Sequence, residues 1–343
     1  MSVKELLQLV VGGEPLDPAS IEAVLGEAMS GTCEPVALGA FLAALASRQP
    51  EAAWLAAGAR ALRAHGVTVR PKVRPLIDTC GTGGDGSGTF NVSTATAFVV
   101  AAAGCAVAKH GNRGVSSAVG SADVLEALGV QLELSPDRAT ELLDTVGFAY
   151  LHAPTFHPAM KHVAPVRRAL GVRTLFNLLG PLVSPARAEF QLVGVYAASM
   201  TRVVAEALKD LGSQGAMVVH CGGVDEIGLH DVTEAHVLRD GRVQAARLTP
   251  EDFGLCRARL EAVQGVADKH GNAALLREAL CGEGGARSDL VAANAAAALL
   301  VAQQVASLRE GAAVARELMT SGAAERVLDR YIASSRAIEE VAR

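Results

Sequence analysis

The stretch VRPLIDTCGTGGDGSGTFNVSTATAFVVAAAGCAVAKHGN, residues 73–112, decides the fold class of this chain. It has the pattern of a short strand (RPLID), a glycine-rich loop, an apolar helix and a second strand (CAVAK). Further strand-like runs at 130–134, 148–152, 190–196 and 216–221 alternate with helical patterns. Strands that alternate with helices indicate a mostly parallel sheet with crossover helices, so we expect an α/β fold.

The first part of the chain has a different pattern. Residues 3 to about 66 contain helical patterns only, with a start signal at Asp17-Pro18 and a stop at Gly31. The segment between the strands at 148–152 and 190–196 also lacks a strand pattern. We therefore predict two domains. The small helical domain consists of residues 1–72, completed by about 158–188, and the α/β domain consists of residues 73–157 and 189–343.

Within the α/β domain, Asp240-Gly241 lies between two extended runs. This dipeptide is a strong signal for a two-residue turn, so we expect a β-hairpin there.

Composition narrows the classes of function. The 343 residues are 50% hydrophobic and 20% charged, which permits a large buried core. The formal charge of -5 gives no overall positive field to attract polyanions, so we expect no nucleic-acid partner. Six cysteines without metal-binding spacing predict buried thiols in a reducing, cytoplasmic compartment. The N-terminus has no signal-peptide pattern, and the apolar runs at 95–108 and 290–306 are too short or too interrupted to span a membrane.

The glycine-rich loop is the strongest chemical signal. Residues 81–89 contain five glycines between a predicted strand and a predicted helix. Backbone N–H groups without neighbouring side chains can approach a phosphate closely, and the helix N-terminus adds donors and partial positive charge. Asn91, Ser93 and Thr94 at the helix start can serve as caps, or as ligands to phosphate oxygens or a metal. The alternative is a flexible turn with ordinary caps.

A second alternative is a dinucleotide site, because Gly81, Gly83 and Gly86 match the pattern GxGxxG. That motif expects an acidic residue at the end of the second strand, where it holds a ribose diol. Here the second strand ends in Lys109 and His110. A cation at this position favours an anionic ligand and argues against a nicotinamide enzyme.

The loop that follows the second strand runs from Lys109 to Ser121, and we expect Ser121 to cap the next helix. Crossover geometry places the ends of the two strands side by side. The two loops would then face each other across a cleft and could hold a pyrophosphate from both sides.

Five motifs in this order resemble the anthranilate phosphoribosyltransferases of tryptophan biosynthesis: GTGGDGSGTFNVST, KHGNR, GSADVLEALG, HPAMKHVAPVRRALG and FNLLGPL. The resemblance covers the whole chain. It implies the fold shared by nucleoside phosphorylases and class IV phosphoribosyltransferases. It also implies transfer of a phosphoribosyl group from phosphoribosyl pyrophosphate (PRPP) to the amino nitrogen of anthranilate, a requirement for Mg²⁺, and a homodimer formed through the helical domain.

The two loops and the resemblance together give the candidate site. The expected substrate-binding residues are Gly81, Gly84, Asp85, Thr89, Asn91, Val92, Ser93, Thr94, Lys109, His110, Gly111, Asn112, Arg113, Ser116, Ser117, Ser121 and Arg167. Among them, Lys109, Asn112 and Arg167 are the expected catalytic residues.

Asp225 and Glu226 follow the strand AMVVHC at a sheet end, where a parallel sheet places its ligands. Acidic pairs on loops are often simply solvated, but the resemblance implies that these two residues and Ser93 hold Mg²⁺. Arg167 and Arg168 are adjacent and cannot share one face of a helix. The resemblance selects Arg167 for the carboxylate of anthranilate, which a guanidinium fork suits.

Some positions differ from the usual family pattern, namely Gly114, Ala118 and Gly228. Two other functions remain open. A pyrimidine nucleoside phosphorylase would share the fold, and a non-catalytic paralogue would bind nucleic acid, although 3% aromatic residues and an acidic charge disfavour the latter.

The tetrapeptide Lys-His-Gly-Asn occurs twice, at 109–112 and at 269–272. The second copy follows no predicted strand, and we expect its Asn272 to cap a helix. We therefore assign it no chemistry.

Overall fold

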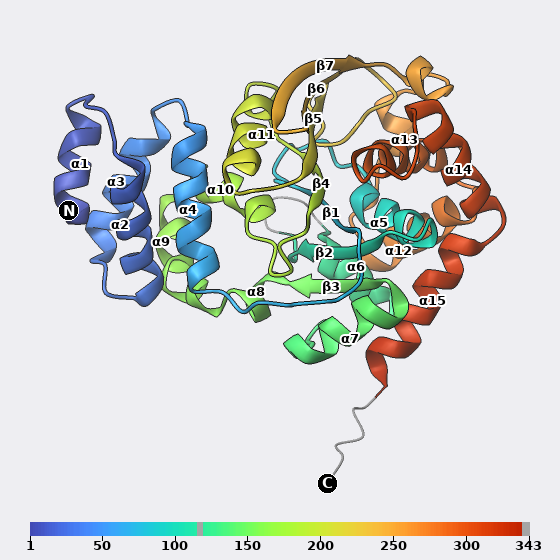
Figure 1. Cartoon of the computed structure of the whole chain (residues 1–343), viewed down its shortest axis with the longest axis horizontal. Coiled ribbons are helices and arrows are strands. Elements are labelled where there is room, and N and C mark those ends of the chain that lie inside the picture. The colour runs from blue at the N-terminus through green and yellow to red at the C-terminus, as the bar shows by residue number, and fades with distance from the viewer. Residues whose placement is uncertain (115–118, 338–343) are drawn as a thin grey trace, which may run out of the picture.

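The computed structural model describes residues 1–114 and 119–337 (Figure 1). Its centre is a seven-stranded sheet in the order β3-β2-β1-β4-β5-β6-β7. Five strands run parallel, namely β1 (Leu76–Gly81), β2 (Ala106–Gly111), β3 (Phe148–His152), β4 (Phe190–Gly194) and β5 (Gly215–Cys221). Two antiparallel strands, β6 (Thr233–Arg239) and β7 (Arg242–Leu248), extend one edge. The predicted α/β class with a mostly parallel sheet is confirmed.

The two faces of the sheet are buried in different cores, because successive side chains of a strand point in opposite directions. Leu192 and Met217 lie in the core formed with α5 (Val92–Ala102) and α13 (Ala286–Val301). Val193 and Val218 lie in a second core on the opposite face. Further helices complete the first layer: α6 (Ser121–Leu128), α7 (Pro136–Val146), α12 (Lys269–Leu280), α14 (Leu308–Thr320) and α15 (Ala323–Arg336).

The second core joins the sheet to the N-terminal helices, with α11 (Met200–Asp210) between them (Figure 1). These helices are α1 (Val3–Val11), α2 (Pro18–Ser30), α3 (Pro35–Ala46) and α4 (Ala52–Ala64). As expected, the Asp17 side chain caps α2, and Gly31 ends it in the left-handed conformation.

The segment between β3 and β4 contains only short helices: α8 (Ala153–Phe156), η1 (Pro158–His162), α9 (Ala164–Leu170), α10 (Phe176–Leu179) and η2 (Gly180–Leu182). Of these, η1 contacts α2, α9 contacts α3 and α10 contacts α4. These contacts support our proposal that residues 158–188 complete the helical domain. The domain boundary stays a proposal, since the second core also includes side chains of β4, β5 and α11.

The predicted hairpin is confirmed. Asp240 and Gly241 both have positive φ values, 49° and 70°, as a two-residue turn of the primed type requires, and Arg239 pairs with Arg242.

The predicted strand at 130–134 is wrong. Val130, Leu132 and Leu134 are buried and the residues between them are exposed, but the segment joins no strand of the sheet. The Gln131 N–H donates instead to Ser335 Oγ at 3.1 Å. The alternation in the sequence reflects a segment that buries every second side chain against the core, which does not require strand pairing.

The expectation of six buried thiols is only partly met. All six cysteines are free, but Cys256 is exposed and Cys33 and Cys281 are partly exposed. In the two described segments, every helix is too short or too polar to cross a lipid bilayer.

Candidate active site

The glycine-rich loop begins at the carboxyl end of β1, beside the end of β4. Gly81 pairs with Gly194, the Thr82 N–H donates to the Gly194 carbonyl at 2.9 Å, and the Tyr196 N–H donates to Thr82 Oγ1 at 3.0 Å. Positive φ values of 62° to 76° occur at four loop positions, Gly83, Gly84, Gly86 and Gly88. Side chains rarely tolerate this conformation, so the loop path itself requires glycine.

Asp225 lies directly against this loop. Its Oδ2 accepts a 2.7 Å hydrogen bond from the Gly83 N–H, and its own N–H donates to Asp85 Oδ2 at 3.1 Å. A Cβ at Gly81 would lie only 2.5 Å from Asp225 Oδ2, and one at Gly194 would collide with the Asp225 carbonyl oxygen. Gly81 therefore leaves space for the Asp225 carboxylate, and Gly194 on the neighbouring strand leaves space for the Asp225 backbone.

The negative charges of Asp225 and Glu226 are unfavourable in the folded protein. Both residues are only 9% exposed. Burial, and then the charge of Asp85, raise the pKa of Asp225 above its usual range, and burial and the charge of Asp225 raise the pKa of Glu226. Such carboxylates ionise readily only when a cation compensates them.

Lys109 is the buried cation that interacts electrostatically with this pair. Its side chain is 2% exposed, and Nζ donates to the Thr79 carbonyl at 2.5 Å and to Ser93 Oγ at 3.1 Å. Burial lowers its pKa, while the charges of Asp78, Glu226 and others raise it. The structure thus brings Lys109 and Ser93 together, beside the acidic pair, as the sequence predicted from separate motifs.

Asp78 is a site residue that sequence reasoning missed. It is fully buried in β1, and its Oδ1 accepts a hydrogen bond from the His110 N–H at 3.2 Å, while Oδ2 has no partner. Burial raises the pKa of Asp78 to about 7, and the Lys109 charge acts in the opposite direction. The available signal was an aspartate inside an otherwise apolar strand.

The donor set fits Mg²⁺. Four acidic residues (Asp78, Asp85, Asp225 and Glu226) and one buried lysine leave an excess of negative charge, which a divalent ion would compensate. Among the described residues, no cluster of three or more His, Cys, Asp and Glu side chains could enclose a metal. An open site with one or two carboxylates, a hydroxyl and free positions for phosphate oxygens suits Mg²⁺.

The start of α5 offers unpaired polar atoms. Asn91 occupies the N-cap position, but its side chain makes no capping bond and its Nδ2 donates to the Val119 carbonyl at 3.3 Å. Asn91 Oδ1 and Thr94 Oγ1 are buried without a hydrogen-bond partner. Val92 is buried in the core, so only its backbone can reach a ligand, and Thr89 forms a β-bridge with Gln264.

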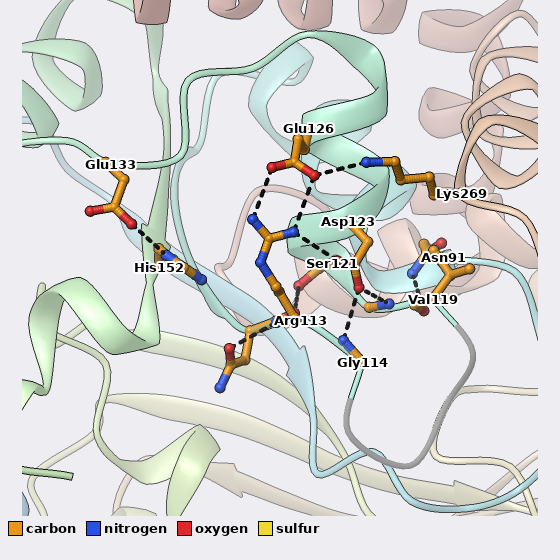
Figure 2. Close-up of polar contacts among 12 residues, drawn as sticks. Asn91, Arg113, Gly114, Val119, Ser121, Asp123, Glu126, Glu133, His152 and Lys269 are labelled. Atoms are coloured by element: carbon orange, nitrogen blue, oxygen red, sulfur yellow. Dashed lines mark hydrogen bonds and ion pairs between the residues drawn. The ribbon is translucent and has the colours of Figure 1, made fainter. Parts of the chain in front are cut away.

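Arg113 in the second loop is already paired with α6. Figure 2 shows its guanidinium between two acidic side chains, at 3.0 Å from Asp123 and 2.9 Å from Glu126. Lys269, from the second copy of the tetrapeptide, reaches the same Glu126 at 2.9 Å. The role of Arg113 as a substrate contact stays a prediction.

The predicted cap at Ser121 is wrong. The N-cap of α6 is Gly120, and the Asp123 carboxylate accepts its N–H at 2.9 Å. Ser121 Oγ instead contacts Tyr150 OH at 2.9 Å and the Asn112 carbonyl at 3.3 Å. An acid three positions into the helix can cap from within, which leaves the serine free to brace the loop. Gly111 lies beside it, where a Cβ would be 2.5 Å from Ser121 Oγ.

The remaining predicted positions lie in the second loop and after the acidic pair. Ser116, Ser117 and Ala118 lie outside the described residues. Gly114 donates its N–H to Asp123 at 3.0 Å. At Gly228 a Cβ would clash with Cys221 Sγ and approach the His230 ring to 2.9 Å, so these neighbours require glycine there.

The expected cap at Asn272 is also wrong, because Asp268 is the N-cap of α12. Asn272 lies in the first turn, where its Nδ2 donates to the Asp268 carbonyl at 2.9 Å and its Oδ1 accepts from the Val266 N–H at 3.3 Å.

Arg167, the residue predicted to bind the acceptor, has no ion-pair partner among the described residues. Arg167 is partly buried on α9, 5.4 Å from the centre of the Phe176 ring, whereas Arg168 is exposed. Within residues 1–114 and 119–337, no carboxylate lies within ion-pair distance of Arg167, and burial lowers its pKa. Such a guanidinium is free to take the carboxylate of a ligand.

His110 is held as a neutral ring. Its Nδ1 lies 3.2 Å from the Gly180 carbonyl, Nε2 is buried without a partner, and the His157 ring packs against it. Burial lowers the pKa of His110 to about 3. It can therefore line the acceptor site by hydrogen bonding, without a charge.

Arg173 is a second residue that the sequence reasoning missed. It follows α9 and donates to the Gly84 carbonyl, while its guanidinium lies 4.4 Å above the Tyr196 ring. It therefore ties the segment that carries Arg167 to the glycine loop. In the sequence, Arg173 is only an arginine just after the helix stop at Gly171. That pattern is too common to indicate a functional residue.

Comparisons with known proteins agree with this arrangement. Residues 4–66 match the helical bundle domain of a glycosyl transferase family, and residues 73–325 match its a/b domain. The anthranilate phosphoribosyltransferase of Symbiobacterium thermophilum is 48% identical over 329 residues, 96% of each chain, and that of Rubrobacter xylanophilus is 45% identical over 336 residues, 97% of this chain and 98% of the other.

Two solved structures are closely similar to the structure of this chain. The anthranilate phosphoribosyltransferase of Thermus thermophilus gives a TM-score of 0.91 at 47% identity, covering 97% of this chain and 99% of the other. The enzyme of Saccharomyces cerevisiae in complex with PRPP and Mg gives 0.89 at 27% identity, covering 98% of both chains. With full-length similarity in sequence and in structure, the chain belongs to the anthranilate phosphoribosyltransferase family of glycosyl transferases.

Proposed function

We propose that this protein transfers the phosphoribosyl group of PRPP to the amino nitrogen of anthranilate in tryptophan biosynthesis. The products are N-(5-phosphoribosyl)anthranilate and pyrophosphate. The observation that carries the proposal is the contact between the glycine loop and the buried Asp225–Glu226 pair, which follow β1 and β5, the two parallel strands on either side of β4. Full-length relatives of 48% and 45% identity bear this enzyme's name.

The donor would bind at the glycine loop. Backbone N–H groups between Gly81 and Thr89, with the start of α5, provide donors for the pyrophosphate. Asp225, Glu226 and Ser93 would hold Mg²⁺, which when bound neutralises charge on the phosphates. Lys109 sets the local charge balance, and its bond to Ser93 Oγ orients that hydroxyl.

The acceptor would bind on the other side of the donor. Arg167 takes the carboxylate of anthranilate and fixes the ring so that its amino nitrogen meets C1 of the ribose. The carbon gains oxocarbenium character as pyrophosphate leaves, so stabilisation of the leaving group supplies most of the rate gain. The aromatic amine is unprotonated at neutral pH and attacks C1 as the bond from C1 to pyrophosphate breaks. The proton that its nitrogen then loses passes to the departing pyrophosphate or to water, so the step needs no base from His110, whose pKa is lowered to about 3.

The decisive experiment follows the fluorescence of anthranilate after it is mixed with the protein, PRPP and Mg²⁺. We expect fluorescence to fall, and to stay constant in a control with EDTA. A parallel assay supplies thymidine or uridine with phosphate. Release of the free base there, with no loss of anthranilate, would instead identify a pyrimidine nucleoside phosphorylase. Binding of nucleic acid without either reaction would indicate the non-catalytic paralogue.

We also propose a homodimer formed through the helical domain, in the cytoplasm. Val11 on α1 and Val36 on α3 are 74% and 79% exposed, unusual for large apolar side chains. The free thiols suit a reducing compartment. Light scattering should give twice the chain mass for the native protein, and a Val11→Asp/Val36→Asp variant should shift toward the monomer. An unchanged mass in that variant would remove this face from the interface.

A further inference from the structure

A surface hollow of about 310 Å³ lies between the helical bundle and the α/β domain, with room for several water-sized groups. None of its lining residues belongs to the candidate active site. They are Arg60, Arg63 and Ala64 at the end of α4, Arg187 just before β4, and Asp210 and Leu211 at the end of α11.

The hollow carries an excess of positive charge, because three arginines and one acid, Asp210, line it. Of its three arginines, only Arg60 has a carboxylate partner, Glu22 at 2.7 Å. Arg63 donates to the Leu182 carbonyl at 2.9 Å, and burial and the charge of Arg187 lower its pKa to about 10. Within the part of the chain that the structure describes, neither Arg63 nor Arg187 has an acid within ion-pair distance. Two such guanidiniums repel each other until an anion lies between them.

A second, small space of about 10 Å³ lies beside the hollow. It shares Arg63 and Arg187 and is also lined by Ser184 and His157. Ser184 is 3% exposed and its Oγ has no hydrogen-bond partner, and His157 Nδ1 is likewise buried and unpaired. A space of this size holds at most one water. That water would satisfy the Ser184 hydroxyl and could bridge it to an anion bound at the two arginines.

The backbone at Arg187 gives a further, independent sign. Its φ of 48° lies in the left-handed region, which is uncommon for residues other than glycine. Strained backbone of this kind persists where the surrounding structure holds it, often at ligand sites. Here it accompanies the placement of the Arg187 side chain in the wall of the hollow.

We propose that Arg63 and Arg187 form a binding site for a phosphate-class oxyanion, which Ser184 reaches through one water, separate from the candidate active site. Guanidinium forks and a hydroxyl donor match the geometry and charge of a phosphate group. All three residues belong to the predicted helical domain, while Asp210 and Leu211 of the α/β domain form the other wall of the hollow.

The test is calorimetric titration of inorganic phosphate into the full-length protein at constant ionic strength, with chloride as the balancing anion. Arg187→Ala should lower the affinity of one phosphate site about tenfold or more, the loss typical of one charge-assisted hydrogen bond. Arg187→Lys should fall between that variant and the native protein. Arg242→Ala, which removes an equal charge from an exposed turn, should bind phosphate as the native protein does.

Two arms separate this site from the donor site and identify the form of the ligand. The phosphate site should persist when PRPP and Mg²⁺ saturate the protein without anthranilate, because the donor pocket is then filled. Ribose 5-phosphate should compete for the site if the hollow accepts phosphate monoesters, and leave phosphate bound if it takes only the free ion. Equal phosphate affinity in the native protein and in Arg187→Ala would overturn the proposal. So would loss of the site on adding PRPP when ribose 5-phosphate does not compete for it.

Discussion

Replacement of Gly81 by alanine would place a methyl group against the carboxylate at the centre of the donor site. The new Cβ would lie 2.5 Å from Asp225 Oδ2 and 3.2 Å from its Cγ, closer than nonbonded atoms allow. The carboxylate is 9% exposed and held by the Gly83 N–H at 2.7 Å, so it can retreat only by giving up that bond.

The size of the effect follows from the bond that is lost. A hydrogen bond to a charged group contributes about 1.5–3 kcal/mol, which corresponds to a roughly ten- to hundredfold change in binding. We therefore expect Gly81→Ala to raise the KM for PRPP by that factor at fixed Mg²⁺. The KM for anthranilate, measured at saturating PRPP, should change by no more than about twofold, because the acceptor contacts are untouched.

The assay is the loss of anthranilate fluorescence, with each substrate varied in turn. Gly26→Ala is the matched control. It adds the same methyl group to α2, where only His65 Cε1 lies within reach, at 3.8 Å. Circular dichroism checks that both variants fold. A folded Gly81→Ala variant with the native KM for PRPP would refute the reasoning, because the Asp225 carboxylate would then not contribute to donor binding.

Three other perturbations test separate parts of the site. Arg167→Ala should raise the KM for anthranilate about tenfold or more and that for PRPP far less, since a charge-assisted bond to the acceptor alone is lost; equal effects on both constants would contradict this role. Arg173→Ala should raise the KM for PRPP, because the glycine loop loses its hydrogen bond at Gly84 and the contact between Arg173 and Tyr196. Arg173→Lys should restore part of the native KM. A change in the KM for anthranilate alone would show that Arg173 does not act through the glycine loop. Asp78→Asn should flatten the pH dependence of stability in EDTA. The pKa of Asp78 is raised from 3.8 in the unfolded chain to about 7 in the folded protein, so its protonated form stabilises the fold below pH 4. The free energy of unfolding should therefore fall by on the order of 4 kcal/mol as the pH rises through 7 in the native protein, and not in the variant. Urea unfolding at several pH values measures this, and parallel curves for the native and variant proteins would disprove it.

Local patterns predicted the framework of the donor site. The order of strand, glycine loop and helix between residues 76 and 102 matches the structure. That order also fixed which strand ends would be neighbours, so Lys109 and Ser93 could be expected near each other, as their 3.1 Å contact bears out. These features depend on short-range preferences and on the handedness of crossover connections, which the sequence reveals directly.

Features that depend on tertiary packing could not be predicted. Asp78 belongs to the candidate site only because Lys109 lies near it, and Arg173 matters only because its segment folds back onto Gly84. The segment at 130–134 was mistaken for a strand because burial of alternate side chains produces the same pattern with or without a paired neighbour. Ser121 was predicted to cap α6, but an acid within the helix, Asp123, does so instead. The two alternatives are local hydrogen bonds of similar strength, so the sequence does not decide between them.

Calorimetric titration of PRPP with and without Mg²⁺, into the native protein and into Asp225→Asn/Glu226→Gln, measures the central interaction directly. We predict that PRPP binds the native protein and that Mg²⁺ strengthens this binding strongly. The double variant should lose that strengthening, because its amides keep the shape but not the charge of the pair. Equal magnesium dependence in both proteins would contradict this prediction.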